Sequence, residues 1–176
     1  MILFKKKQDQ SESMKKLPVL LVAAIMCVVL AACGHKTPQE IVLKALDVDV
    51  SGGAEISYED THGGFPADGK TSIILQFNDN SVLDAIKKDP KWKVFPLDET
   101  TQALVYGLEN DASQTGPFLS NGDGNLMVPE IQNGYYILID RHSEKDKNIL
   151  ERYSFNFTVG LYDVDTNIMY FFKLDT

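Results

Sequence analysis

Residues 152–174 read RYSFNFTVGLYDVDTNIMYFFKL, and their periodicity determines the fold class. From Arg152 to Leu161 apolar and polar side chains alternate, which is typical of an antiparallel strand with one buried face. Residues 163–167 are a turn signal, and we expect residues 168–174 to pair back as the second strand of a hairpin. Apolar residues occupy both parities of this second strand. It is therefore either a central strand covered on both faces, which we favour, or it exposes an aromatic patch for a partner.

The preceding chain adds short helices and further strands to this hairpin. We predict helices over 38–46, 82–88 and 99–106, and strands or extended segments over 54–59, 71–77, 92–95 and 135–140. Thr37 to Glu40 form a capping box at the start of the first helix. Residues 109–125 are expected to be a loop, residues 141–148 a solvated connection, and Trp92 a core residue. The fold class is α+β, with an antiparallel sheet of about five strands, two or three short helices and a C-terminal β-hairpin.

The amino-terminal residues have the organisation of an export signal. Lys15 and Lys16 precede an apolar run, residues 17–32, that ends on small residues. The run contains a proline and is shorter than the roughly 20 residues that a membrane-spanning helix needs, so a permanent transmembrane anchor is the weaker interpretation. Met14 is a natural start for such a signal. Alternatively, translation begins at Met1 and the basic region is longer.

The last four residues of this region are Leu30-Ala31-Ala32-Cys33. They resemble the lipobox of bacterial lipoproteins, in which a leucine and two small residues precede a cysteine. The resemblance implies that cleavage falls before Cys33 and that the Cys33 thiol carries a diacylglyceryl group. The protein would then be anchored to the cell membrane on its extracytoplasmic face, because two or more acyl chains give stable anchoring. The alternative is a soluble secreted protein.

Cleavage before Cys33 would divide the chain into a signal peptide at 1–32, a lipidated tether at 33–37 and one globular domain at 38–176. The mature chain carries 12 basic and 23 acidic side chains, a net charge of −11 against −8 for the whole sequence. This acidity argues against nucleic-acid binding, which uses clustered Lys and Arg. Because Cys27 leaves with the signal and Cys33 is lipidated, no free thiol remains for a disulfide or a thiolate metal site.

The segment most suggestive of chemistry is the loop at residues 59–69, EDTHGGFPADG. Its candidate ligand-binding residues are Asp60, His62, Gly63, Gly64 and Asp68. Glycines let a ligand approach the backbone, and an imidazole beside carboxylates can bind a metal or transfer protons. The competing interpretation is a strand-to-strand turn in which the aspartates make local turns. The chain has no Gly-x-Ser-x-Gly motif, so an esterase-type serine nucleophile is excluded.

Two other loops are rich in oxygen ligands. Residues 121–125 resemble the start of an EF-hand loop, but Leu126 stands at the position of the invariant glycine and Gln132 at that of the bidentate glutamate. The tip of the C-terminal hairpin is similarly acidic. We interpret both as surface loops, with a weak calcium site as the alternative. His35 and His142 lack a ligand-like spacing to another histidine and are expected to be solvated.

These features favour a non-catalytic binding or interaction module that is tethered to the membrane through the lipid on Cys33. We expect no catalytic residue, no metal and no cofactor. The partner is another envelope protein, which the module regulates or inhibits, or a small ligand. This hypothesis predicts an exposed apolar patch or groove. The alternative is an envelope hydrolase or metal-dependent enzyme in which Asp60, His62 and Asp68 converge on a concave pocket.

Overall fold

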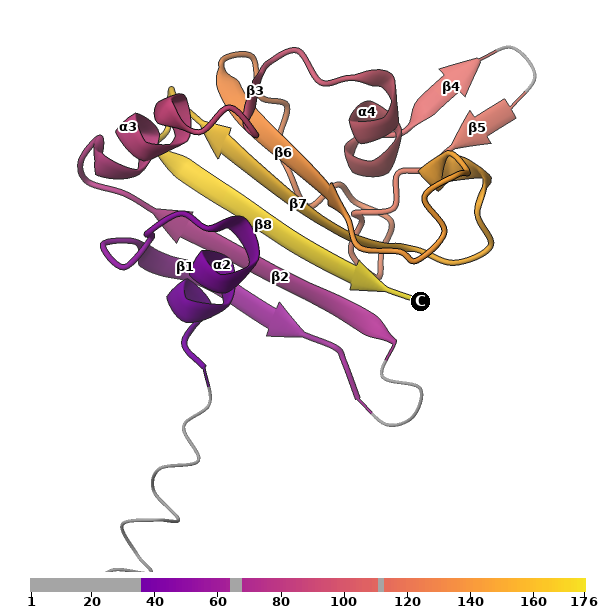
Figure 1. The fold of residues 1–176 in the computed structure, drawn as a ribbon, viewed down its shortest axis with the longest axis horizontal. Helices are drawn as coiled ribbons and strands as arrows, with labels where there is room; N and C mark the ends of the chain where they lie inside the picture. Colours follow the sequence, from indigo (N-terminus) through magenta and orange to yellow (C-terminus); the bar gives the residue numbers. More distant parts are fainter. Residues whose placement is uncertain (1–35, 64–67, 111–112) are drawn as a thin grey trace, which may run out of the picture. The chain divides into compact units, whose positions relative to one another are not determined.

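The computed structural model describes residues 36–63, 68–110 and 113–176 (Figure 1). The helices are α2 (Pro38–Leu46), α3 (Ser81–Lys88) and α4 (Glu99–Val105), with a 3-10 helix at Ile149–Glu151. The strands are β1 (Ala54–Asp60), β2 (Gly69–Gln76), β3 (Lys93–Val94), β4 (Leu108–Asn110), β5 (Ser113–Thr115), β6 (Gly134–Asp140), β7 (Asn156–Asp163) and β8 (Ile168–Asp175). The predicted export signal, Cys33 and Gly64 lie outside the described residues.

Six strands form one antiparallel sheet in the order β1-β2-β8-β7-β6-β3 (Figure 1). The predicted α+β class is confirmed, and β7 and β8 form the predicted C-terminal hairpin. The prediction of a loop over 109–125 is wrong at its start, because β4 and β5 pair as a separate two-stranded hairpin. The sheet joins distant parts of the chain, since β8 lies between β2 and β7.

Both faces of the central strands are covered. On one face, α2, α3 and Trp92 pack over a cluster that includes Met169 and Phe171 of β8. On the other face, α4 and neighbouring loops pack over a cluster that includes Tyr170 and Phe172. The prediction that β8 is a central strand covered on both faces is therefore confirmed, as is the core position of Trp92. Adjacent residues of a strand point to opposite faces, so the apolar residues at even and odd positions of β8 pack into the two different clusters.

Strand β7 departs from the predicted half-buried strand over residues 152–161. It begins at Asn156, and Thr158 and Gly160, which were expected on a solvent face, are buried. A Cβ built at Gly160 would lie 2.7 Å from Leu46 Cδ1 and 3.0 Å from Trp92 Cη2. The missing side chain thus lets α2 and the indole pack directly on the strand. The alternation signals a strand, but the covering of its polar face depends on residues far away in the sequence.

Helix α2 has the predicted bounds because its start is specified locally. The Thr37 hydroxyl accepts a hydrogen bond from the Glu40 N–H (3.2 Å), and the Glu40 carboxylate accepts one from the Thr37 N–H (2.9 Å). Pro38 occupies the first turn, where its missing N–H leaves no bond unmade. Among the described residues, no helix is both long and apolar enough to span a membrane.

Candidate functional site

The connection between β1 and β2 contains the predicted site residues. The Thr61 N–H donates to the Lys70 carbonyl (2.9 Å) and the Lys70 N–H to the Thr61 hydroxyl (2.9 Å), so the ladder continues one pair beyond Asp60. Gly63 is exposed, and no atom approaches within 4 Å of a Cβ built there. Asp68 is also exposed and forms no hydrogen bond or ion pair with the described residues. Of the four predicted residues that the structure describes, it brings only Asp60 and His62 together.

His62 lies between two carboxylates. Its Nδ1 is 2.6 Å from Asp60 Oδ1, and its Nε2 is 3.1 Å from Asp175 Oδ2 at the end of β8. Only 17% of the imidazole side chain is exposed, so the ring is held against the protein. A Cβ built at Gly69 would lie 2.6 Å from the His62 Cα, and a side chain there would displace this part of the loop. A doubly protonated imidazole donates to both carboxylates at once.

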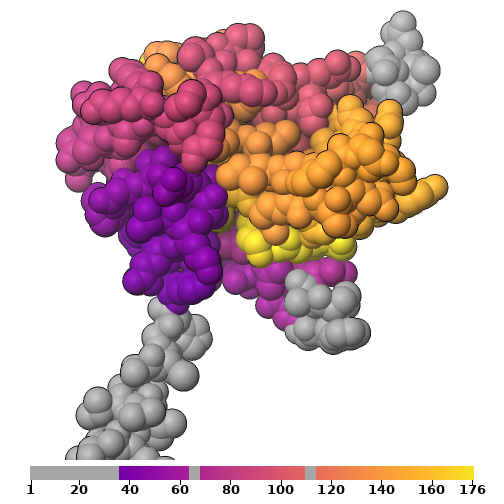
Figure 2. Space-filling view, in the orientation of Figure 1, coloured from indigo at the N-terminus to yellow at the C-terminus, as the bar shows by residue number. Residues whose placement is uncertain are grey.

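Asp175 is the partner of His62 that the sequence interpretation missed. Its carboxylate also pairs with Arg141 (2.7 Å) and Lys173 (2.6 Å). Burial acts to raise the pKa of Asp175, but the hydrogen bonds from Lys173 and Arg141 outweigh it and lower that pKa below its usual value. Figure 2 shows the end of β8, in yellow, at the surface of the molecule. The cluster thus ties the β1–β2 connection to the end of the central strand.

The geometry of this cluster is that of a structural clasp. The two carboxylates contact opposite ring nitrogens of His62, so they do not converge with one nitrogen on a single ion. Within the described part of the chain, no group of three His, Cys, Asp or Glu side chains is placed to hold a metal ion. These contacts support the interpretation of residues 59–69 as a strand-to-strand turn.

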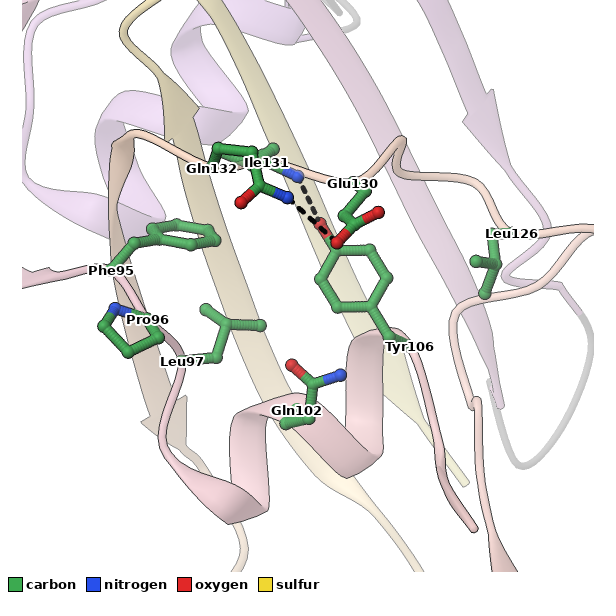
Figure 3. A pocket seen from close by; sticks show the side chains of 9 residues that line it. All are labelled: Phe95, Pro96, Leu97, Gln102, Tyr106, Leu126, Glu130, Ile131 and Gln132. Atoms are coloured by element: carbon green, nitrogen blue, oxygen red, sulfur yellow. Dashed lines mark hydrogen bonds between the residues drawn. The ribbon is translucent and has the colours of Figure 1, made fainter.

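A groove of about 570 Å³ lies elsewhere, on the α4 face of the sheet (Figure 3). Three chain segments form it: the connection between β3 and α4, the C-terminal end of α4, and the segment that precedes β6. Its nine lining residues are Phe95, Pro96, Leu97, Gln102, Tyr106, Leu126, Glu130, Ile131 and Gln132. Aromatic and aliphatic side chains form its walls, and amide, carboxylate and phenol groups lie among them.

Asp98 positions the α4 side of the groove. Its carboxylate caps α4 by accepting hydrogen bonds from the N–H (2.9 Å) and hydroxyl (2.7 Å) of Thr101, and it pairs with Lys93 of β3 (2.8 Å). The Asp98 N–H donates to the Tyr136 hydroxyl on β6 (3.0 Å). Burial acts to raise the pKa of Asp98, but the bonds from Lys93 and Thr101 outweigh it and lower the pKa from 3.8 to about 2.

Tyr106 positions the opposite wall. Its hydroxyl donates to the Pro129 carbonyl (2.7 Å) and accepts from the Ile131 N–H (3.3 Å), which fixes the segment before β6 against the end of α4. Burial raises the pKa of Tyr106 to about 12, so its phenol stays protonated and keeps donating at neutral pH. At the rim, the Gln132 amide donates to the Glu130 carboxylate (2.9 Å; Figure 3).

The groove combines free polar groups with an exposed apolar wall. The side-chain amide of Gln102 makes no hydrogen bond to the described residues, and Leu126 is 49% exposed. Of the nine lining side chains, only Glu130 is charged at neutral pH. No signal in the sequence indicates this groove, because its walls come from irregular segments that are brought together only by the α4–sheet packing.

No family model, curated protein or solved structure matches the chain.

The two acidic loops use their oxygen atoms for local turns. The Asn121 Oδ1 accepts hydrogen bonds from the N–H groups of Asp123 (3.0 Å) and Asn125 (2.8 Å). At the hairpin tip, the carboxylate of Asp163 accepts one from the Asp165 N–H (2.9 Å) and another from a threonine hydroxyl (2.7 Å). Both arrangements support the interpretation as surface turns.

His142 is half-buried and forms hydrogen bonds, whereas the sequence predicted a solvated side chain. Its Nδ1 accepts a hydrogen bond from the Glu144 N–H (3.0 Å), and its Nε2 lies 3.0 Å from the Ser154 hydroxyl. The ring therefore bridges the two ends of the β6–β7 connection and is half-buried there. His35 lies outside the described residues.

Proposed function

We propose that this protein is a membrane-anchored, extracytoplasmic lipoprotein that acts as a non-catalytic binding module, with the groove at α4 as its ligand site. The groove is the observation that carries the proposal, because a binding module needs an exposed concave surface with both apolar and polar groups. Its volume of about 570 Å³ suits a ligand of small-molecule size. The lipobox motif that ends at Cys33 supports the anchoring.

Helix α2 and the groove lie on different faces of the sheet. Three residues separate Cys33 from the helix cap Thr37, so an extended chain places the two at most about 14 Å apart. A lipid on Cys33 would therefore hold α2 near the membrane. Helix α2 packs on one face of the sheet, and the buried groove residue Ile131 belongs to the cluster on the other face.

The lining residues indicate the class of ligand. Glu130 disfavours an anion, as does the net charge of −8 on the chain. Gln102 and Gln132 each offer a donor and an acceptor, and Phe95 and Leu97 offer apolar contact area. We therefore expect a neutral or cationic small molecule with one apolar face and several hydrogen-bonding groups.

The test is a titration of the isotope-labelled mature chain with small neutral and cationic molecules that carry an apolar ring. Ligands should shift the amide resonances of Phe95, Leu97 and residues 130–132. Gln102→Ala and Leu126→Lys should each weaken binding at least tenfold, since one removes a free amide and the other places a charge on the apolar wall. Leu43→Lys is the matched control, because Leu43 is 43% exposed on α2. Ligands that perturb only other surfaces, or that bind Leu126→Lys unchanged, would contradict the proposal.

The alternative of an envelope hydrolase or metal-dependent enzyme requires Asp60, His62 and Asp68 to converge on a pocket. Asp68 has no described contact with His62, and none of the three lines the groove. The binding module is therefore the function that the geometry supports best.

A further inference from the structure

Strand β1 is the outermost strand on one side of the sheet (Figure 1). All seven of its residues are exposed, and none belongs to either core cluster. Ile56 is 54% exposed and Tyr58 is 41% exposed, which is unusual for such large apolar side chains on a regular strand. The strand at the opposite edge, β3, has only two residues. Thus β1 is the long free edge of the sheet and displays apolar side chains that the core does not use.

The backbone of β1 offers unpaired hydrogen-bonding groups. The Thr61 N–H donates to the Lys70 carbonyl on β2. In an antiparallel ladder, the backbone N–H and C=O groups of alternate residues point toward and away from the partner strand. Counting back from Thr61 along the regular register, Tyr58 and Asp60 direct their N–H and C=O groups toward the free edge. Such a row is a template for the addition of another strand.

The charge of β1 selects the kind of strand that fits. Glu55, Glu59 and Asp60 are acidic, and the strand has no Lys or Arg. Antiparallel pairing of two copies centred on Glu59 would place the two Glu59 side chains opposite each other, and like charges opposite each other destabilise a sheet. The bulge between Glu55 and Ser57 also interrupts the edge. The negative charges and the bulge disfavour pairing with a second copy. The same negative charges attract an extended segment with cationic side chains.

We propose that the free edge of β1 binds an extended basic segment of another protein, which adds to the sheet as a seventh strand. Lysine or arginine side chains of this segment lie opposite Glu59 on one face of the sheet, and its apolar side chains lie beside Tyr58 on the other face. This surface is separate from the groove, so the two proposals stand or fall independently.

The probe is a ten-residue peptide that alternates lysine with valine and threonine. It should bind the mature chain at least tenfold more tightly than the same peptide with glutamate in place of lysine, as measured by calorimetry at low salt. Binding should weaken with added salt, because the attraction is between exposed charges. On binding, the amide protons of Tyr58 and Asp60 should become protected from solvent exchange. Absence of binding, equal binding of the two peptides, or protection elsewhere on the protein would overturn the proposal.

Two kinds of variant test the edge directly. Tyr58→Pro removes an outward N–H without touching the β1–β2 ladder, a substitution that edge strands tolerate, and it should reduce affinity at least tenfold. Since this variant could fail to fold, Glu59→Lys provides a second test with an intact backbone, and it should also lower affinity for the basic peptide at least tenfold. Asp84→Lys, at an exposed position on α3, makes the same change in net charge and should alter affinity less than threefold. Equal effects of Glu59→Lys and Asp84→Lys would show general charge attraction and overturn the β1 site.

Discussion

His62 links the β1–β2 connection to the end of β8. It contacts Asp60 on β1 and Asp175 on β8, two residues that lie far apart in the sequence. We expect His62→Ala to lower the free energy of unfolding by about 1 to 2 kcal/mol, because hydrogen bonds to charged partners are lost. Asp68→Ala, in the same loop, should change it by less than about 0.5 kcal/mol. Urea denaturation measures both. Equal stabilities of the two variants would contradict the role of His62 as a structural clasp.

Asp98 should make the free energy of unfolding depend on pH in the acid range. Its pKa of about 2 in the folded protein is below the ordinary value of 3.8, so its carboxylate stabilises the fold above about pH 4 and this contribution is lost as the pH falls toward 2. We therefore expect Asp98→Asn to be less stable than the unmodified protein at pH 6, with a difference that disappears near pH 2. Urea denaturation across this range measures it. A difference that is constant with pH would contradict the assignment.

At the scale of elements, the β6–β7 connection is fixed by a buried cation. Arg152 pairs with Asp140 (2.9 Å) and donates to the Lys147 carbonyl (2.7 Å). We expect Arg152→Leu to cost about 1 to 3 kcal/mol, since it leaves Asp140 without its buried partner, and to make residues 142–151 more sensitive to limited proteolysis. Lys145→Ala removes an exposed pair with the same Asp140 and should cost less than about 1 kcal/mol. A larger loss of stability in Lys145→Ala than in Arg152→Leu would contradict the role of Arg152, because the connection would then depend on the exposed ion pair.

The elements that were predictable are those with local signals. Helix α2 has the predicted bounds because Thr37 and Glu40 specify its start, and β8 is central because its apolar residues occupy both parities. Asp175 was not predictable as a partner of His62, since their contact depends on the register between β2 and β8. The expectation that Arg152 lies on a solvent face failed for a related reason, because its partner Asp140 belongs to another strand.

At the scale of the whole molecule, the membrane anchor is the prediction with the simplest outcome. Cys33→Ser removes the thiol that would carry the lipid, so we expect the protein to move from the membrane fraction of the cells to the soluble or secreted fraction. Cys27→Ser is the matched control, because Cys27 lies within the signal and should leave anchoring unchanged. Fractionation followed by immunodetection measures both. Retention of Cys33→Ser in the membrane fraction would contradict lipid anchoring.

The position of β8 between β2 and β7 has a consequence for the order of folding. Both hydrophobic clusters include β8 side chains, so neither is complete until residues 168–175 have left the ribosome. Before then, β1 and β2 have no bonded link to the rest of the sheet. Pairing across such long sequence separations slows folding. The two hydrophobic clusters are therefore completed together, once the central strand β8 is available to both.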